Sequence, residues 1–243
     1  MGSADAQEDE RPVHRVYVSA FSIGRFAVSQ EEYGRFVTAT GYPAPAVRQL
    51  PLVTAGRARI FRERAAPYVW EGDGPPPGRA GHPIALVRFD DAVAYCKWLS
   101  ESLGRAVRLP TEAEWEKAAR GGVAGLRYPW GNEIDAGQCN FLADPAAKAR
   151  SGTRPVGSYA PNGYGLHDVA GNVWEWVSDW YSSDYYSSSE PRDPNGPPAG
   201  TMRVVRGGSW VNDEIEMLRC GYRHPVPPDT YAYSIGFRIV CPG

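Results

Sequence analysis

Glycine and proline interrupt this chain so often that long regular elements have little room to form. Residues 43–82 are rich in proline, glycine and arginine, and residues 128–200 hold aromatic side chains separated by turn-forming residues. The 243 residues include 27 Gly and 22 Pro alongside 8 Trp and 14 Tyr. Loops of this length are usually functional or packed by their own side chains. We therefore expect a turn-rich chain that is anchored by large aromatic residues.

Capping signals predict three short helices between these loops. Ser29 begins one capping box and Thr111 begins a second, and each is followed by apolar residues at helical spacing. Asp90 or Asp91 is the expected cap of a third helix, which precedes Gly104. Alternating apolar residues predict strands in HRVYVSAFSIG (14–24), MRVVRGGSW (202–210) and SIGFRIV (234–240).

Charge and hydropathy exclude two classes of partner. The net charge is −2, so nothing in the overall charge favours nucleic acid or an anionic membrane. No apolar run approaches the length of a membrane span. The segment MGSADAQEDER lacks the apolar core of a signal peptide, so a cytoplasmic location is the default expectation. Export after removal of an upstream leader is the alternative.

The four cysteines, Cys96, Cys139, Cys220 and Cys241, form no CxxC pair. Cys96 lies on the apolar face of a predicted helix, where a small core residue is expected. Cys220 and Cys241 would form a disulfide in an exported chain and would be free thiols in the cytosol. Both alternatives stay open from the sequence.

Asp168 and Glu175 bracket a short glycine-containing turn in the segment NGYGLHDVAGNVWEWVSDWY (162–181). Carboxylates interleaved with free backbone carbonyls suit a hard cation such as calcium. The alternative is that Trp174, Trp176 and Trp180 form core and the two acids only solvate its rim. Judged on the acids alone, the second interpretation is favoured.

Several segments occur in an order that resembles the sulfatase-modifying-factor family, whose founding member is the formylglycine-generating enzyme. They are DERPVHRVYV (9–18), RLPTEAEWEKAARGG (108–122), YPWGNE (128–133), PVGSYAPNGYGLHDVAGNVWEWVSDWY (155–181), RVVRGGSW (203–210) and GFRIV (236–240). The resemblance spans nearly the whole chain. It implies a single α+β domain over residues 1–243, with the C-type-lectin-like fold variant of this family and little regular secondary structure.

The resemblance also implies a structural calcium ion. Asp168 and Glu175 would bind it through their side chains, and Gly171 and Val173 through backbone carbonyls. A second family calcium site would begin at Asn140 and Phe141. The loop that follows them is shortened and lacks the expected acidic run, which argues against that second site.

Copper is not expected, although the family's enzymes use it. After their RGGS motif, formylglycine-generating enzymes carry two cysteines that bind copper(I), and soft thiolates are the ligands this ion needs. Counted from Ser209, the matching positions are Asn212 and Met217, and neither is cysteine. Cys220 lies three residues beyond the second position, so we expect it to be structural. The resemblance therefore predicts a member without formylglycine-generating activity.

The segment from Val211 to Ser234 would form the ligand-facing surface of such a fold. Candidate ligand-binding residues in it are Asn212, Met217, Tyr222, His224, Tyr231 and Tyr233. The three tyrosines are expected to point outward, because tyrosine is a common contact residue in binding surfaces. In the variable proteins of diversity-generating retroelements, which are relatives in this family, this same segment is mutagenised. A Ser209–His224–Asp229 triad is not favoured, because no nucleophile elbow surrounds the serine.

Two functions from different classes follow. The favoured one is a ligand-binding or recognition module on a calcium-stabilised scaffold, in the manner of a variable protein, with an unidentified protein or small molecule as its partner. The alternative is a metal-dependent oxidoreductase of the same family that acts on a protein or natural-product substrate. The missing cysteine pair favours the first, and the retained scaffold favours the second.

Overall fold

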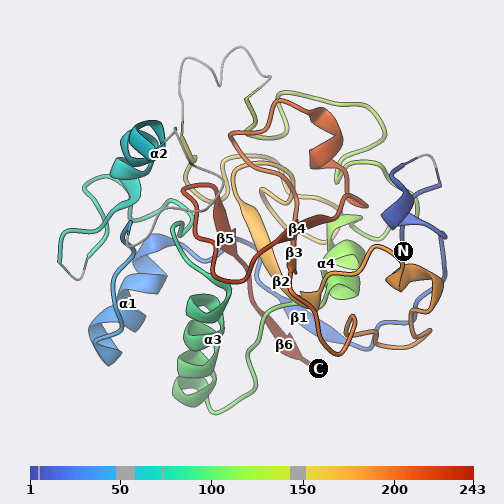
Figure 1. Cartoon of the computed structure of the whole chain (residues 1–243), viewed down its shortest axis with the longest axis horizontal. Coiled ribbons are helices and arrows are strands. Elements are labelled where there is room, and N and C mark those ends of the chain that lie inside the picture. The colour runs from blue at the N-terminus through green and yellow to red at the C-terminus, as the bar shows by residue number, and fades with distance from the viewer. Residues whose placement is uncertain (5, 48–57, 73, 143–151) are drawn as a thin grey trace.

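A small mixed sheet lies at the centre of the molecule, with short helices around it (Figure 1). The computed structural model describes residues 1–4, 6–47, 58–72, 74–142 and 152–243. The α-helices are α1 (Gln30–Thr40), α2 (Ala58–Ala65), α3 (Phe89–Leu103) and α4 (Glu112–Ala119). The strands are β1 (Phe21–Ile23), β2 (Trp174–Trp180), β3 (Arg203–Arg206), β4 (His224–Val226), β5 (Ile235–Phe237) and β6 (Val240–Pro242). Single 3-10 turns cover Glu8–Glu10, Ala66–Tyr68, Tyr185–Ser187 and Ile215–Leu218.

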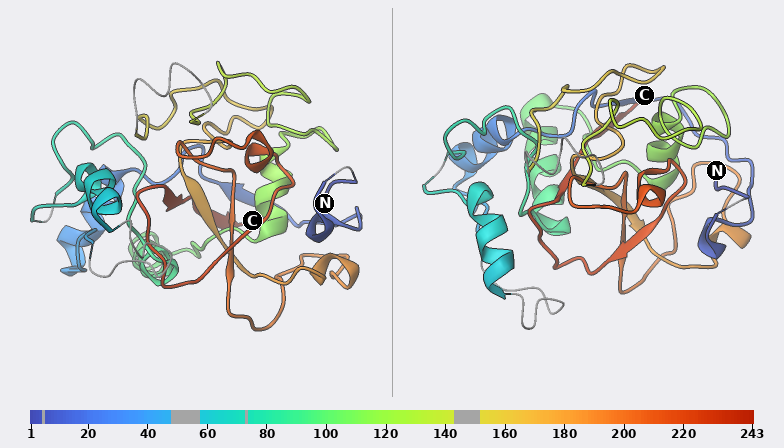
Figure 2. Two further views of the ribbon diagram at one scale, coloured as in Figure 1. Left: turned by 45° about the horizontal axis from the view of Figure 1, so that its top comes forward. Right: turned by 90° about the horizontal axis from the view of Figure 1, so that it is seen from above.

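The fold class is confirmed: the chain has an α+β fold with 25% helix and 14% strand. Helices α1, α2 and α3 lie on one side of the central sheet, and α4 lies on the other side with the N-terminal segment (Figures 1 and 2). Within the described ranges, no helix is long and apolar enough to cross a membrane.

The helix starts follow the predicted caps at two of three places. The side chains of Ser29 and Thr111 each accept a hydrogen bond from the third residue of their helix, which completes both capping boxes. The third cap is different from the prediction, because α3 has Arg88 as its N-cap. Asp91 sits inside the first turn, where its carboxylate accepts a hydrogen bond from the Arg88 backbone N–H at 2.9 Å.

The central sheet has the strand order β4-β3-β2-β5. Strand β3 runs antiparallel to both β2 and β4, whereas β5 runs parallel to β2. A separate pair joins β1 to β6. The predicted strand 234–240 is therefore divided between two sheets: Phe237 ends β5 beside β2, and Val240 begins β6 beside β1.

Tryptophan side chains form the centre of the core, as the sequence predicts. Trp176 is completely buried and donates a hydrogen bond to the Val87 carbonyl at 3.1 Å. Trp174 and Trp210 are also buried, and Cys96 is a core residue as expected. Trp180 differs, since it is only half-buried and lies beneath the Arg203 guanidinium at 3.5 Å.

A buried network of ion pairs joins β3 to α4. Arg206 is fully buried and pairs with Glu116 at 2.7 Å. Arg223, also buried, pairs with Glu112 at 2.7 Å. Paired geometry is what permits charges in a protein interior, because an unpaired one would lose its hydration without compensation.

Asp179 lies at the edge of this network and is itself buried. Its carboxylate accepts hydrogen bonds from the Glu112 backbone N–H at 2.8 Å and from the Ser178 hydroxyl at 3.1 Å. Burial, followed by repulsion from the Glu112 carboxylate, raises the pKa of Asp179 to about 7. The folded state therefore binds a proton that the unfolded state releases near its ordinary pKa of about 3.9.

We predict that Asp179 makes stability fall as the pH rises toward neutrality. Because the folded pKa is raised, the contribution of this group is complete below about pH 4 and is lost through about pH 7. Asp179→Asn keeps an oxygen acceptor but cannot ionise, so it should lose less stability than the wild type between pH 5 and pH 8. Urea unfolding of both proteins at the two pH values measures this. An equal loss in both proteins would assign the pH dependence to another group.

Candidate functional site

The fold brings Asn212 and Met217 into direct contact. Asn212 follows β3 through the RGGSW motif, and its Oδ1 accepts hydrogen bonds from the Ser209 backbone N–H at 2.8 Å and the Ser209 hydroxyl at 2.7 Å. Its Nδ2 lies 2.9 Å from Met217 Sδ, which the 3-10 turn Ile215–Leu218 carries back toward β3. Positions 212 and 217 are therefore adjacent in space, as a metal-binding pair would have to be.

The chemistry at this pair is an amide and a thioether. The amide oxygen of Asn212 already accepts hydrogen bonds from Ser209. The thioether sulfur of Met217 is therefore the one soft atom of this pair that could coordinate a metal ion. The thiol of Cys220 lies in a cluster around Trp115 and is buried. Burial raises the pKa of the Cys220 thiol to about 12, which leaves it protonated and unreactive at neutral pH.

No disulfide involves any of the four cysteines, which all lie within the described ranges. Cys220 is buried, whereas Cys241 is half-buried in β6, and no disulfide joins them. The sequence left this pairing open, and the structure has the reduced form.

Tyr222 is part of the core, which corrects the expectation that it points outward. It is buried, with its ring centroid 6.0 Å from that of Trp174. The His224 ring, in β4, stacks on the Trp174 ring with a centroid distance of 5.0 Å. Trp174, Tyr222 and His224 thus form an aromatic row. His224 pairs with Val205 of β3, so β4 continues the sheet, and Tyr222 just before it belongs to the core cluster that contains Trp174 and Val226. Burial lowers the pKa of His224, so its imidazole is neutral at physiological pH.

Tyr231 and Tyr233 also pack inward, contrary to the same expectation. Tyr231 is buried in a cluster that contains Phe61 and Trp210. Tyr233 is half-buried, with ring centroids 5.4 Å from Phe61 and 5.6 Å from Trp210. The physical reason is that α2, from a distant part of the chain, covers this loop. The exposed residues of the segment are Asp213, Glu214, Ile215, Pro227 and Asp229.

The structure does not assemble the disfavoured Ser209–His224–Asp229 triad. The Ser209 hydroxyl donates to Asn212, His224 stacks on Trp174, and Asp229 is exposed.

Asp168 retains one carboxylate oxygen that a cation could use. Its Oδ2 accepts a hydrogen bond from the Gly157 backbone N–H at 2.5 Å, whereas Oδ1 is buried without a hydrogen-bond partner. Burial raises the pKa of this carboxyl group. A cavity of about 20 Å³ lies beside it, between Trp130 and Val169, and has room for one water molecule or one ion. Asp168 therefore fits the calcium expectation.

Glu175 fits that expectation less well. Its carboxylate accepts hydrogen bonds from Arg238 at 2.6 and 2.7 Å and from the Trp115 indole at 2.7 Å. It is therefore a buried, neutralised acid and not a rim residue. Arg238 also donates to the carbonyl of His167 at 3.1 Å, so one guanidinium connects Glu175 to the residue that precedes Asp168.

The backbone positions of the expected calcium set lie in one tight turn. Gly171 has a φ of 78° and donates its N–H to the Gly207 carbonyl at 2.8 Å, and Val173 is buried. Asn140 and Phe141, at the doubtful second site, are buried, and residues 143–151 after them lie outside the described part of the chain. Across the described residues, no group of three or more His, Cys, Asp or Glu side chains could hold a metal ion.

The two partners of Glu175, Arg238 and Trp115, were not predicted from the sequence. A signal for the first existed, because an arginine within the apolar run SIGFRIV has no solvent to reach and must find a buried acid. No comparable signal marks Trp115, which is one of the apolar residues that follow Thr111 at helical spacing.

We predict that Tyr222 behaves as a core residue. Replacing a large buried aromatic residue with Ala typically costs about 3–5 kcal/mol, so Trp174→Ala should unfold at much lower urea concentration. Tyr222→Ser should also destabilise clearly, because it opens a hole beside the same ring. Tyr164→Ser is the matched control: Tyr164 is 55% exposed, and exposed sites change stability by about 0.5 kcal/mol or less. Wild-type stability in Tyr222→Ser would place that ring at the surface.

Comparison with known proteins agrees with the fold and the motifs. The family model for the sulfatase-modifying factor enzyme 1-like domain matches residues 1–242. The formylglycine-generating enzyme of Thermomonospora curvata is 38% identical over 270 residues, which cover 96% of this chain and 85% of that enzyme. The serine/threonine-protein kinase pkn1 of Chlamydia pneumoniae is 41% identical over 239 residues, which cover 98% of this chain but 35% of the kinase.

Two solved structures are similar over the whole chain. PvdO from Pseudomonas aeruginosa has a TM-score of 0.81 at 27% identity, and the match covers 100% of this chain and 90% of PvdO. Treponema denticola variable protein 1 has a TM-score of 0.76 at 26% identity, with 100% and 91% of the two chains covered. The chain therefore belongs to the sulfatase-modifying factor family, in which formylglycine-generating enzymes are its relatives at about 38% identity.

Proposed function

We propose that this chain is a member of the family that does not generate formylglycine and instead binds a ligand through the surface of residues 211–234. The observation that carries the proposal is the contact between Asn212 and Met217 at 2.9 Å. The two positions that would hold copper(I) in a formylglycine-generating enzyme are adjacent here, yet they present an amide and a thioether in place of two thiolates. The buried thiol of Cys220 cannot substitute for them.

The likeness to Treponema denticola variable protein 1 supports a recognition role for the same scaffold. The exposed residues of the segment indicate what such a surface would prefer. Asp213 and Glu214 are acidic and directly precede the exposed Ile215, and Asp229 is a further exposed acid of the segment. This arrangement suits a protein or small-molecule ligand that carries positive charge next to a small apolar group.

The alternative function is a metal-dependent oxidoreductase that acts on a protein or a natural product. It is favoured by the 38% identity to a formylglycine-generating enzyme and by the similarity to PvdO. In that case a metal other than a bis-thiolate copper ion would have to bind. Metal analysis of the purified protein separates the two: near-stoichiometric copper or iron supports the oxidoreductase.

We predict that the wild-type protein does not oxidise the cysteine of a Cys-x-Pro-x-Arg peptide in the presence of copper(I), oxygen and a thiol reductant. The double variant Asn212→Cys/Met217→Cys should gain tight copper(I) binding, because the fold already places these two side chains in contact. Competition with a coloured copper(I) chelator measures binding, and mass spectrometry of the peptide measures the aldehyde.

The control for that experiment is Cys220→Ser in both backgrounds. It should change neither copper binding nor turnover, because Cys220 is buried in the Trp115 cluster. Robust aldehyde formation by the wild type would overturn the proposal and support the oxidoreductase.

We also propose that calcium binds at Asp168, since the unpartnered Oδ1 and the adjoining cavity supply one ligand and room for an ion. A ligand at a hundred times its dissociation constant stabilises the native state by about 2.7 kcal/mol. Chelation should therefore lower the melting temperature of the wild type, and Asp168→Asn should remove most of this difference. Asp184→Asn, at an exposed acid, is the control. Identical wild-type melting curves with and without chelator would refute the calcium site.

A further inference from the structure

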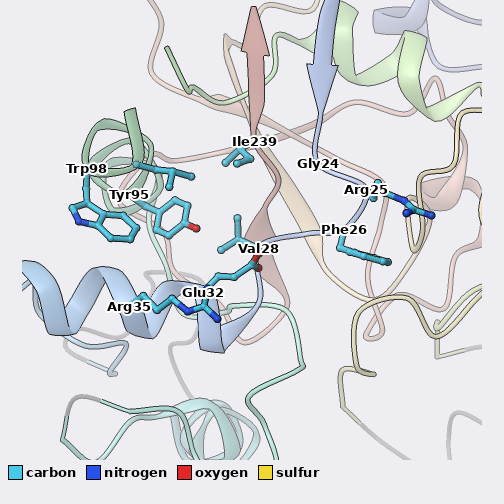
Figure 3. A pocket seen from close by; sticks show the side chains of 10 residues that line it. Gly24, Arg25, Phe26, Val28, Glu32, Arg35, Tyr95, Trp98 and Ile239 are labelled. Atoms are coloured by element: carbon cyan, nitrogen blue, oxygen red, sulfur yellow. The ribbon is translucent and has the colours of Figure 1, made fainter. Parts of the chain in front are cut away.

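A pocket of about 250 Å³ lies between α1, α3 and the connection from β1 to α1 (Figure 3). None of its lining residues belongs to the 211–234 segment or to the proposed calcium ligands. Its volume exceeds that of the cavity of about 150 Å³ that is known to hold benzene. It falls just below the range of about 300–1,000 Å³ for drug-sized ligands. The pocket is therefore the right size for one substituted ring.

Most of the pocket wall is apolar. Val28 and Ile239 line its inner part, and Phe26 lies on the opposite wall (Figure 3). Phe26 is 39% exposed, although its ring centroid lies 5.0 Å from that of His167. Burial of such surface against a ligand ring would be favourable by the hydrophobic effect.

One polar group points into this apolar space. The ring of Tyr95 is held by stacking on Tyr33 at 5.7 Å and by edge contact with Phe237 at 5.4 Å. Its hydroxyl points toward Val28, among the residues that line the pocket (Figure 3). Burial, together with the nearby Glu32 carboxylate, raises the pKa of Tyr95, so the hydroxyl remains protonated and can donate a hydrogen bond. No hydrogen bond links this hydroxyl to another residue in the described ranges.

The charges at the pocket favour an anion. Arg25 and Arg35 line it against the single carboxylate of Glu32. The Glu32 Oε2 is already bound by the Ser29 backbone N–H at 2.8 Å and the Ser29 hydroxyl at 2.7 Å. The partner of Arg35 is Glu31, in a pair whose side chains are 67% and 61% exposed. Exposed ion pairs of this kind contribute little to the stability of the fold. Arg35 can therefore leave Glu31 and bind a ligand with little loss of free energy.

We propose that this pocket binds a small aromatic carboxylate. The ring would pack against Phe26, Val28 and Ile239, and the carboxylate would accept hydrogen bonds from the Tyr95 hydroxyl and the Arg35 guanidinium. Two sources share this chemistry, namely a free aromatic acid and the C-terminal aromatic residue of a peptide. The site is independent of the 211–234 surface.

Isothermal titration with four probes tests the proposal and distinguishes the sources. The probes are phenylacetate, phenylacetamide, and acetyl-Gly-Phe as its free acid and as its amide. At least one acid should bind saturably, and its amide should bind about tenfold more weakly, since a charge-assisted hydrogen bond is lost. Binding of the peptide acid alone assigns the site to a peptide C-terminus. Absence of saturable binding by both acids at millimolar concentration overturns the proposal, as does equal binding of acid and amide.

Two variants locate the binding in this pocket. Tyr95→Phe keeps the packed ring and removes the hydroxyl, and Arg35→Gln removes the guanidinium, so each should weaken the acid by about tenfold without lowering the melting temperature. Arg59→Gln is the matched control, because Arg59 forms the same kind of exposed helical pair with Glu63 on α2. Unchanged affinity in both test variants, or an equal loss in Arg59→Gln, would place the bound acid elsewhere and overturn the proposal.

Discussion

The Arg206 guanidinium holds the most irregular part of this fold in place. It is fully buried, pairs with Glu116, and donates to the backbone carbonyls of Cys220, Gly221 and Tyr222 at 2.6–2.9 Å. Those carbonyls lie in a segment without a strand partner, and a buried carbonyl without a hydrogen bond is costly. The Arg206 side chain, from β3, therefore supplies hydrogen bonds to these carbonyls that backbone N–H groups of a neighbouring strand would supply in a longer sheet. Removing it would leave these carbonyls without their donor and would take from Glu116 Oε2 its partner, although Arg120 still binds Glu116 Oε1.

The hydrogen bonds of Arg206 explain how side chains in the loop after the RGGSW motif can differ while the rest of the fold is unchanged. The chain leaves the sheet at Ser209, which is hydrogen-bonded to Asn212, and it is fixed again at Cys220, whose carbonyl accepts a hydrogen bond from Arg206. The loop between Asn212 and Cys220 is called the excursion below. Residues between these two points pack little of the core, apart from Leu218 and the half-buried Met217. Loops supported at both ends by a rigid scaffold tolerate substitution well, which is why function concentrates in them. We therefore expect that the side chains at positions 212 and 217 can change with little effect on the rest of the fold.

Sequence signals predicted the local features of this structure and failed on the features that depend on distant segments. The capping boxes at Ser29 and Thr111 are local and were predicted correctly. Strand β2 was not predicted, because its residues are buried on both faces and show no alternation. Tyr231 is buried by residues of α2, about 170 positions away in sequence, so its exposure could not be inferred from the residues near it. The family motifs supplied the global fold, which local patterns alone did not.

The burial of these tyrosines narrows where recognition can occur. A surface that varies between proteins must change its side chains without loss of the native state, whose net stability is only about 5–15 kcal/mol. Substitution of Tyr222 or Tyr231 removes core contacts, so variation at these positions would destabilise the native state. Asp213, Glu214 and Ile215 are exposed, and they lie on the excursion whose two ends are fixed by Asn212 and Arg206. Changes at these three residues would alter the charge and shape of the surface while the aromatic row of Trp174, Tyr222 and His224 stays packed behind it. Under the proposed binding role, residues 213–215 are therefore where we expect ligand specificity to change with the least loss of stability.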